Sequence, residues 1–347
     1  MKGSYLLTLQ LLFGSYTRNA GTGIYQATLN TETKQLTQPT AYITAGNPTY
    51  LTVSQAKRLY SVLAEPDAGG LVAYDLTDFN APKFLNKSVQ PGSSPAYVAV
   101  DETRQLVYSA KYHSGQLLIH RILPDGSLEL ATTVTDHGHG PKPEQDGAHV
   151  HFADLTPDQR LVTCDLGTDE VHTYDVATDG QVSEVALYQT IAGFGPRHIV
   201  FHPTAPVAYL AGELGSAIEV LHYDATTGQF SHLQTIPTIP ADFTAHNGAA
   251  AIRISSDGRF LYVSNRGHNS LAVFTIEADQ TLKLQQLIST EGEFPRDFAL
   301  DPSESFLVCA NQNTSNLTLF ARDEQTGQLS LLQKNIACTE PVCVKFL

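Results

Sequence analysis

The sequence is poor in tryptophan, methionine and cysteine. Its 347 residues include no Trp, one Met and four Cys. Cys164, Cys309, Cys338 and Cys343 fall inside or beside strand-like patterns and lack the spacing of metal ligands, which predicts buried free thiols rather than disulfides. Free thiols are typical of a reducing compartment, so we expect a cytoplasmic protein.

Positive charge is also scarce. Lys and Arg number 21 against 35 Asp and Glu, which gives a formal net charge of -14. Nucleic acids and anionic membranes are bound through basic surfaces, so neither is an expected partner. An anionic small-molecule substrate would need a local cluster of Arg or Lys instead.

Long apolar runs are missing. No stretch reaches the roughly 18 residues that a transmembrane helix needs. The N-terminal run YLLTLQLLFGSYT (residues 5–17) is apolar, but Gln10 interrupts it, and it has neither a basic leader beyond one Lys nor a small-x-small cleavage site. This run therefore predicts strands rather than a signal peptide.

One short sequence motif occurs seven times. It consists of a small residue or Pro followed by a strand-like segment in which apolar and polar residues alternate. It begins at Pro48, Pro95, Ala148, Pro196, Ala249, Pro295 and Pro341, at intervals of 46 to 53 residues. Self-similarity with this period is the signature of a propeller or a solenoid. The motif thus predicts a repeat architecture for the whole chain.

Each repeat contains four strand-like segments with β-branched and aromatic residues, separated by turns rich in Gly, Asp and Asn. Seven such repeats predict an all-β, seven-bladed β-propeller of four antiparallel strands per blade, one domain over residues 1–347, with helices only as short turns. The chain before Pro48 lacks an anchor strand, and Pro341 begins an anchor strand with nothing after it. We expect the two ends to complete one blade together.

Two positions of the repeat carry charged side chains in only some blades. The position after each anchor is Thr49, Ala96, His149, Arg197, Ala250, Arg296 and Val342, and the position near the end of the second strand is Thr17, Ala64, Tyr112, Leu166, Glu213, Arg266 and Gln312. Equivalent positions surround the channel of a propeller. We therefore expect the charged members of both sets near one channel mouth.

These residues also have structural interpretations. Glu213 with Arg197 or Arg266 would form an ion pair between blades. His151 and His198, beside the first position, are expected to bind substrate or to form hydrogen bonds next to the site. Two further residues, Asp165 and Asn265, are expected with equal weight to form turn or inter-blade hydrogen bonds or to act as ligands.

Two long loops depart from the repeat. The first, VTDHGHGPKPEQDGAHVHF (residues 134–152), includes His137 and His139. Its spacing is not that of a structural zinc site and no Cys joins it, so we expect a loop over the channel mouth rather than a metal site. The second, TIPTIPADFTAHNGAA (residues 235–250), carries His246 and Asn247 and is expected to form another wall.

The chain resembles the lactonase family of seven-bladed propellers, which includes 6-phosphogluconolactonase and carboxymuconate cyclase. The matching segments are FGSYT, DLGTDEVHTYDV, GPRHIVFHP, AYLAGEL, SSDGRFLYVSNRGHNSLAVF, FPRDFALDP and CANQNTSNLTLF. The resemblance implies an active site at the mouth of the channel. Its residues would be His149, Arg197, Glu213 and Arg266. One departure is Glu144 before Gln145, where family members often carry Arg, and this would weaken the attraction for phosphate if the position faces the site.

The resemblance predicts hydrolysis of a sugar lactone, most specifically 6-phosphogluconolactone, with no metal or other cofactor. Glu213 or His149 would be the general base and Arg197 would stabilise the oxyanion. Arg266 and Arg296 would bind the anionic end of the substrate. His151, His198, Gln312 and Tyr112 complete the predicted substrate-binding set.

Two other functions remain open. A cycloisomerase acting on a muconate-type polycarboxylate lactone would use the same residues. A non-catalytic binding propeller is the alternative from another class, although repeats of the WD type carry Trp and this chain has none. In each case we expect a monomer or weak dimer.

Overall fold

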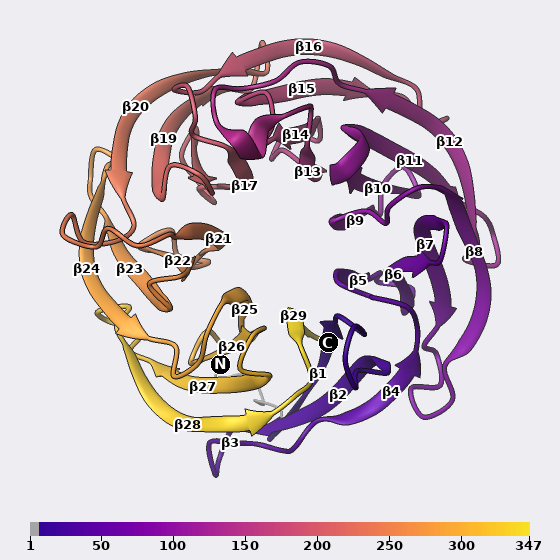
Figure 1. Ribbon diagram of the computed structural model, residues 1–347, viewed down its shortest axis with the longest axis horizontal. Helices are drawn as coiled ribbons and strands as arrows, with labels where there is room; N and C mark the ends of the chain where they lie inside the picture. Colours follow the sequence, from indigo (N-terminus) through magenta and orange to yellow (C-terminus); the bar gives the residue numbers. More distant parts are fainter. Residues whose placement is uncertain (1–6) are drawn as a thin grey trace. The chain divides into compact units, whose positions relative to one another are not determined.

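The computed structural model describes residues 7–347, and contacts group the chain into two units. Unit 1 comprises the residues up to Asn47 together with Thr238–Leu347, and unit 2 comprises Pro48–Pro237. Each unit consists of complete antiparallel sheets, labelled strand by strand in Figure 1.

Unit 2 contains four sheets of four strands each. In chain order they are β5 (Leu51–Val53), β6 (Arg58–Glu65), β7 (Ala68–Asp75) and β8 (Lys83–Pro91); β9 (Tyr97–Asp101), β10 (Leu106–Lys111), β11 (Gln116–Ile122) and β12 (Leu128–Thr135); β13 (Val150–Leu155), β14 (Leu161–Asp165), β15 (Glu170–Val176) and β16 (Val182–Gln189); and β17 (Pro196–Phe201), β18 (Val207–Gly212), β19 (Ala217–Asp224) and β20 (Gln229–Pro237). The first strands of successive sheets contact one another.

Unit 1 contains three sheets. Two are continuous in sequence: β21 (Gly248–Ile254), β22 (Phe260–Arg266), β23 (Ser270–Ile276) and β24 (Leu282–Ser289); and β25 (Pro295–Leu300), β26 (Phe306–Asn311), β27 (Asn316–Arg322) and β28 (Leu329–Ala337). The third joins the chain ends, with β29 (Pro341–Phe346), β1 (Thr8–Ser15) and β2 (Gly23–Asn30) in that order, and β3 (Gln35–Leu36) and β4 (Thr40–Thr44) both paired to β2.

The composite sheet confirms the predicted closure by both ends of the chain. β1 pairs antiparallel with β29, and Phe13 lies opposite Val344. Of the N-terminal run predicted as strands, Thr8–Ser15 form β1, whereas Tyr5 and Leu6 lie outside the described residues. The seven antiparallel sheets confirm the prediction of a seven-bladed β-propeller. The assignment of a single domain stays a prediction.

Burial follows the strand position within each sheet. The second strands are almost completely buried, as in β10, whereas most side chains of an outer strand such as β16 are exposed. Tyr60, Tyr108, Tyr209 and Tyr262 stand at the same place of four second strands and are fully buried. Buried tyrosine needs a partner for its hydroxyl, and that of Tyr60 donates to the Gly126 carbonyl at 3.1 Å.

The predicted free thiols and short helical turns are also found. All four cysteines are buried and none forms a disulfide with another, and burial raises the pKa of the Cys338 thiol to about 12. The helices of residues 7–347 are single 3₁₀ turns, η1 (Tyr112–Ser114) and η2 (Pro143–Gln145). Within this range no helix has the length and apolar character to cross a membrane.

Candidate active site

β-Bulges in the first strands of some sheets remove candidate side chains from the regular pairing between strands. In β17, Pro196 pairs with Gly212 and His198 pairs with Ala211, so Arg197 is the extra residue of a β-bulge. A bulge redirects a side chain and is a common device beside functional sites. The bulge explains locally why Arg197 does not simply continue the alternation of the strand.

The strand pairing also corrects the register of the blade formed by β13–β16, which is the fourth when the composite blade of the chain ends is counted as the first. In β13, Val150 pairs with Asp165 and Phe152 pairs with Cys164, so His151 is the bulged residue. His151, not His149, is therefore the structural equivalent of Arg197. The predicted placement of His149 at this position was wrong by two residues, and His149 lies in the segment that leads into the strand.

Arg197 and Glu213 form an ion pair in unit 2. The Arg197 Nε lies 2.9 Å from the Glu213 Oε2, and the two side chains are 3% and 20% exposed. The backbone N–H of Glu213 donates to the Gly195 carbonyl at 2.8 Å, which places the carboxylate beside the start of β17. The predicted alternative of an ion pair between blades is thus wrong in one respect, because both partners belong to the same blade.

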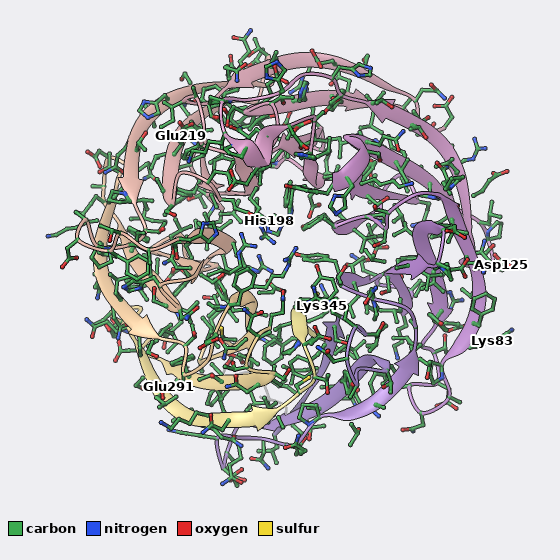
Figure 2. All side chains as sticks on the ribbon, in the orientation of Figure 1. Lys83, Asp125, His198, Glu219, Glu291 and Lys345 are labelled. Atoms are coloured by element: carbon green, nitrogen blue, oxygen red, sulfur yellow. The ribbon has the colours of Figure 1, made fainter. Side chains whose placement is uncertain are left out.

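His198 lies directly behind this pair. An Nη of Arg197 is 3.4 Å from the His198 Nε2, and because a guanidinium only donates, this ring nitrogen is the acceptor. The ring is 2% exposed and lies edge-on to Tyr97 at a centroid distance of 5.2 Å. Figure 2 shows His198 on the β17 side of its sheet and Glu219 farther out.

Tyr112 connects the two histidines of the fourth blade. Its ring stacks on His149 with centroids 4.4 Å apart and planes inclined by 9°, and it meets His151 edge-on at 5.7 Å. His151 in turn lies 5.2 Å from His198. Unit 2 therefore brings six of the predicted residues into one contiguous cluster, which comprises His149, Tyr112, His151, His198, Arg197 and Glu213.

The orientation of His149 is defined at both ring nitrogens. Nδ1 lies 3.1 Å from the Tyr112 carbonyl oxygen, and Nε2 lies 2.9 Å from Oδ1 of Asp146. Its backbone N–H donates to the Asp165 carboxylate at 2.7 Å. His149 is thus held by its main chain, its stacking partner and both nitrogens.

Asp165 organises a turn, which was one of its two predicted roles. Besides His149, its Oδ1 accepts the backbone N–H groups of Gly167 at 2.8 Å and Thr168 at 3.2 Å. Burial raises the pKa of this carboxyl, while the backbone hydrogen bonds act in the opposite direction. The carboxylate faces backbone donors on three residues, as expected for a turn organiser.

The first long loop packs against the neighbouring blade. The Lys142 Nζ donates to the Leu214 carbonyl at 2.7 Å, and the buried Gln145 donates to the Leu166 carbonyl at 2.9 Å. Glu144 is exposed. Within residues 7–347 no group of three or more His, Cys, Asp or Glu could hold a metal ion, and His137 and His139 are exposed.

The remaining candidates belong to unit 1. Arg266 is 5% exposed, donates to the carbonyls of Gly248 and Ala249 at 3.3 and 3.1 Å, and lies 5.1 Å from the Phe294 ring centroid. The backbone N–H of Gln312 donates to the Phe294 carbonyl at 3.1 Å. Arg266 and Gln312 are therefore neighbours of one aromatic residue.

The second long loop is anchored by Asn247 and Asn265. Asn265 accepts the Thr238 hydroxyl at 2.7 Å, and Asn247 accepts the His268 N–H at 3.0 Å. These bonds give Asn265 a structural hydrogen-bonding role, one of the two kinds of role predicted for it. His246 is exposed, and its predicted place in a wall of the site stays a prediction.

Sequence reasoning missed several neighbours of the site. Tyr50 and Tyr97 surround His198, with ring centroids at 6.2 and 5.2 Å. Both residues stand two places after their anchor proline, where the fifth blade has His198. Reading this third position of the repeat would have found them. Asp146, which contacts His149, had no such signal.

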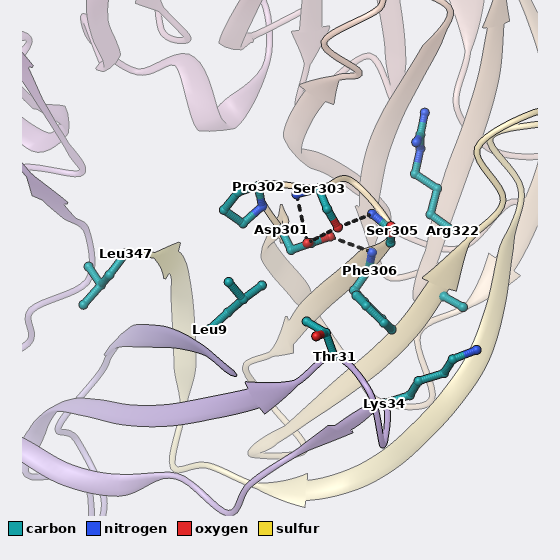
Figure 3. Close-up of a pocket in the computed structure, with 11 residues that line it drawn as sticks. Leu9, Thr31, Lys34, Asp301, Pro302, Ser303, Ser305, Phe306, Arg322 and Leu347 are labelled. Carbon is teal, nitrogen blue, oxygen red and sulfur yellow. Dashed lines mark hydrogen bonds between the residues drawn. The ribbon is translucent and has the colours of Figure 1, made fainter. Parts of the chain in front are cut away.

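A separate cavity of about 630 Å³ lies in unit 1 (Figure 3). It is found at the turn between β25 and β26, where Asp301 accepts hydrogen bonds from the N–H groups of Ser303 and Phe306 at 3.0 and 2.7 Å. This turn is at the opposite end of β25 from Arg296. The cavity lining includes no His and no Cys, so the predicted chemistry is not found there.

One largely buried carboxyl within the first loop gives a stability prediction. Asp136 lies 3.8 Å from the His172 Nε2, and Glu170 lies 3.5 Å from the same nitrogen. Burial, the largest cause, raises the pKa of Asp136 to about 6, with His172 lowering it and nearby carboxylates raising it further. A carboxyl whose pKa is higher in the folded chain binds its proton more tightly there.

The stabilisation from Asp136 is therefore fully present below the unfolded pKa near 4 and is lost as the pH rises through about 6. We expect the unfolding free energy of wild type to fall, relative to that of Asp136→Asn, by on the order of 2 kcal/mol over this range. Urea unfolding at several pH values measures the difference. A constant difference would contradict this account of Asp136.

With the geometry established, comparison with known proteins defines the class. Residues 10–346 match the family described as "Lactonase, 7-bladed beta-propeller". The 6-phosphogluconolactonase of Bacillus subtilis (strain 168) is 42% identical over 340 residues, which cover 96% of this chain and 97% of that protein.

Two solved structures agree with this result. A crystal structure of a protein from Lactobacillus plantarum is 56% identical, with a TM-score of 0.97 and coverage of 98% of this chain and 99% of that chain. The periplasmic gluconolactonase PpgL of Pseudomonas aeruginosa is 29% identical, with a TM-score of 0.91 and coverage of 98% and 99%. The chain belongs to the lactonase family of seven-bladed β-propellers, and the predicted enzyme class is confirmed.

Proposed function

We propose that this chain hydrolyses a sugar lactone and that its substrate is 6-phosphogluconolactone. The name of the Bacillus subtilis relative supports the substrate, and the family supports the reaction class. The observation that carries the proposal is the Arg197–Glu213 pair, in which a guanidinium only 3% exposed lies beside a carboxylate and a buried His198. A donor and a proton acceptor at this separation suit the attack of water on an ester carbonyl.

In the proposed reaction, water attacks the lactone carbonyl carbon while Glu213 or His149 accepts a proton from that water. Arg197 donates to the carbonyl oxygen as negative charge develops on it. The ring C–O bond then breaks, and the protonated base returns the proton to the departing ring oxygen. The products are a hydroxyl group and a carboxylic acid that ionises at neutral pH, so one water is consumed and no net oxidation occurs.

The other predicted residues receive supporting roles in this proposal. His151, His198 and Tyr112 belong to the cluster and would position the sugar hydroxyls. Arg266, Arg296 and Gln312 are predicted to bind substrate on the basis of their positions in the repeat. The carboxylate of Glu144 is exposed. Solvent would screen its repulsion of a phosphate, so its effect on phosphate binding would be modest.

The direct test is acid release from freshly prepared 6-phosphogluconolactone, compared with its spontaneous hydrolysis. Glucono-1,5-lactone and a muconate-type lactone complete the panel. Faster hydrolysis of the phosphorylated lactone than of the other two supports the proposal. Turnover of only the muconate-type lactone would favour the cycloisomerase, and the absence of any turnover would favour a binding propeller.

The proposed mechanism uses side chains alone, so metal removal gives a simple prediction. We expect the rate after treatment with EDTA and dialysis to stay within about 20% of that of untreated enzyme, because no step of this chemistry requires a Lewis acid. The same assay measures it. A large loss that added Zn²⁺, Mg²⁺ or Ca²⁺ restores would contradict metal independence.

We further propose a cytoplasmic location and a monomer or weak dimer. Four buried thiols support a reducing compartment, although the Pseudomonas aeruginosa relative is named as periplasmic. Cell fractionation and light scattering test these two proposals independently of activity.

A further inference from the structure

Two arginines lie against one tyrosine ring in unit 1. The guanidinium carbon of Arg18 is 3.8 Å from the Tyr16 ring centroid, and that of Arg296 is 5.8 Å from it. Both distances are within the range of about 6 Å over which a cation is attracted to an aromatic face. Neither Tyr16 nor Arg18 was a candidate from the repeat analysis.

The two cations differ in their partners. Arg18 is neutralised by Glu340, whose Oε1 lies 3.0 Å from an Nη of Arg18 and 3.1 Å from its Nε. Arg296 is half-buried, and within residues 7–347 it has no hydrogen-bond or ion-pair partner. Partial burial of an uncompensated charge is costly unless a ligand uses it. This contrast singles out Arg296.

The segment that carries the ring is held in place by several hydrogen bonds. The Tyr16 N–H donates to the Glu340 carbonyl at 3.1 Å, and the Asn19 N–H donates to the Glu340 carboxylate at 3.2 Å. The Thr17 N–H donates to the Asn47 side chain at 2.7 Å. The backbone that carries the ring is therefore fixed before any ligand binds, which lowers the entropic cost of binding.

The arginine is also fixed at its backbone. In β25, Pro295 pairs with Asn311 and Asp297 pairs with Ala310, so Arg296 is the extra residue of a β-bulge. Arg197 occupies the same bulge position in β17. The same backbone device thus presents a guanidinium in both strands, but within residues 7–347 Arg197 pairs with the Glu213 carboxylate whereas Arg296 pairs with no carboxylate.

We propose that Arg296 and the hydroxyl of Tyr16 form a subsite for a phosphate monoester. A guanidinium offers two parallel N–H donors to two phosphate oxygens, and the phenol can donate to a third. The Tyr16 hydroxyl has no hydrogen-bond partner within residues 7–347. That this phosphate is carried by the lactone substrate rests on the proposed function, whereas the affinity for the phosphate monoester does not.

The kinetic test compares Arg296→Gln with Arg18→Gln, a matched change in the other cation on the same ring. For Arg296→Gln we expect kcat/KM on 6-phosphogluconolactone to fall about 30-fold, mainly through KM, and that on glucono-1,5-lactone to fall at most about 3-fold. Arg18→Gln should change either value less than about 3-fold. Tyr16→Phe keeps the ring and should cost about 5-fold on the phosphorylated lactone only.

A binding measurement separates this inference from the proposed function. Calorimetric titration with 6-phosphogluconate, the phosphorylated product, should give about 30-fold weaker binding to Arg296→Gln than to wild type, and Arg296→Lys should fall between them. If wild type hydrolyses neither lactone but shows this loss, the subsite stands and the proposed function falls. Equal binding by wild type and a folded Arg296→Gln, or equal kinetic losses on both lactones, would overturn the subsite.

Discussion

Replacing Arg197 with Met is expected to lower kcat on 6-phosphogluconolactone by about 100- to 1000-fold, the usual effect of removing one oxyanion donor. The side chain of Arg197 is almost fully buried and is held by Glu213, so its position needs no reorganisation when charge develops on the substrate. Methionine keeps much of the apolar stem and loses every donor. Single-turnover measurement of acid release separates this loss from changes in substrate binding.

Arg104→Met is the matched control for this change. Arg104 also pairs with a buried carboxylate, the Asp101 Oδ2 at 2.7 Å, but at the turn between β9 and β10. Its loss should reduce the unfolding free energy by roughly 2 kcal/mol while kcat of the folded enzyme changes less than about 2-fold. Equal kcat in wild type and Arg197→Met would show that Arg197 is only a structural partner of Glu213.

Replacing Glu213 with Gln is expected to lower kcat by about 100- to 10,000-fold if this carboxylate is the general base. Gln has nearly the same shape and keeps a side-chain oxygen beside the Arg197 Nε, so the local packing is retained. His149→Gln is the informative comparison, because only one of the two residues is required to accept the proton. A much larger loss for His149→Gln would assign that role to His149.

The double variant tests whether the pair acts as a unit. When two residues serve one step, removing the second after the first costs little more. We therefore expect kcat of Arg197→Met with Glu213→Gln to lie within about 10-fold of the lower single variant. Fully multiplicative losses would indicate that the two side chains act independently.

The repeat predicted most of the fold because every blade obeys the same pattern of burial and turns. Pro196 and Pro295 begin strands, as their motifs predicted, and the terminal strands pair as the missing anchor strand required. The fourth blade was misplaced because Ala148 and His149 precede Val150 and His151, so two alternating registers fit the sequence equally well. The β-bulge at His151 is set by pairing with β14, which the pattern alone does not reveal.

Contacts between distant segments were harder to predict. Glu213 and Arg197 could be paired from sequence, because the end of a second strand lies beside the start of the first in an antiparallel sheet. The contact of Arg296 with Tyr16 depends on the loop after β1 and on Glu340 before β29. Tyr16 and Glu340 do not occupy the repeat position that identified Arg296 as a candidate. The spacing of the repeat therefore could not predict the contact between Arg296 and the Tyr16 ring.

The chain belongs to the lactonase family, and we propose that its catalysis depends on the Arg197–Glu213 pair. The most direct measurement is the rate of acid release from fresh 6-phosphogluconolactone by wild type and by Arg197→Met at equal concentration and fold content. Rapid hydrolysis by wild type, with a loss of about 100-fold or more in the variant, is the predicted result. A wild-type rate equal to spontaneous hydrolysis, or equal rates for both proteins above it, would contradict the account.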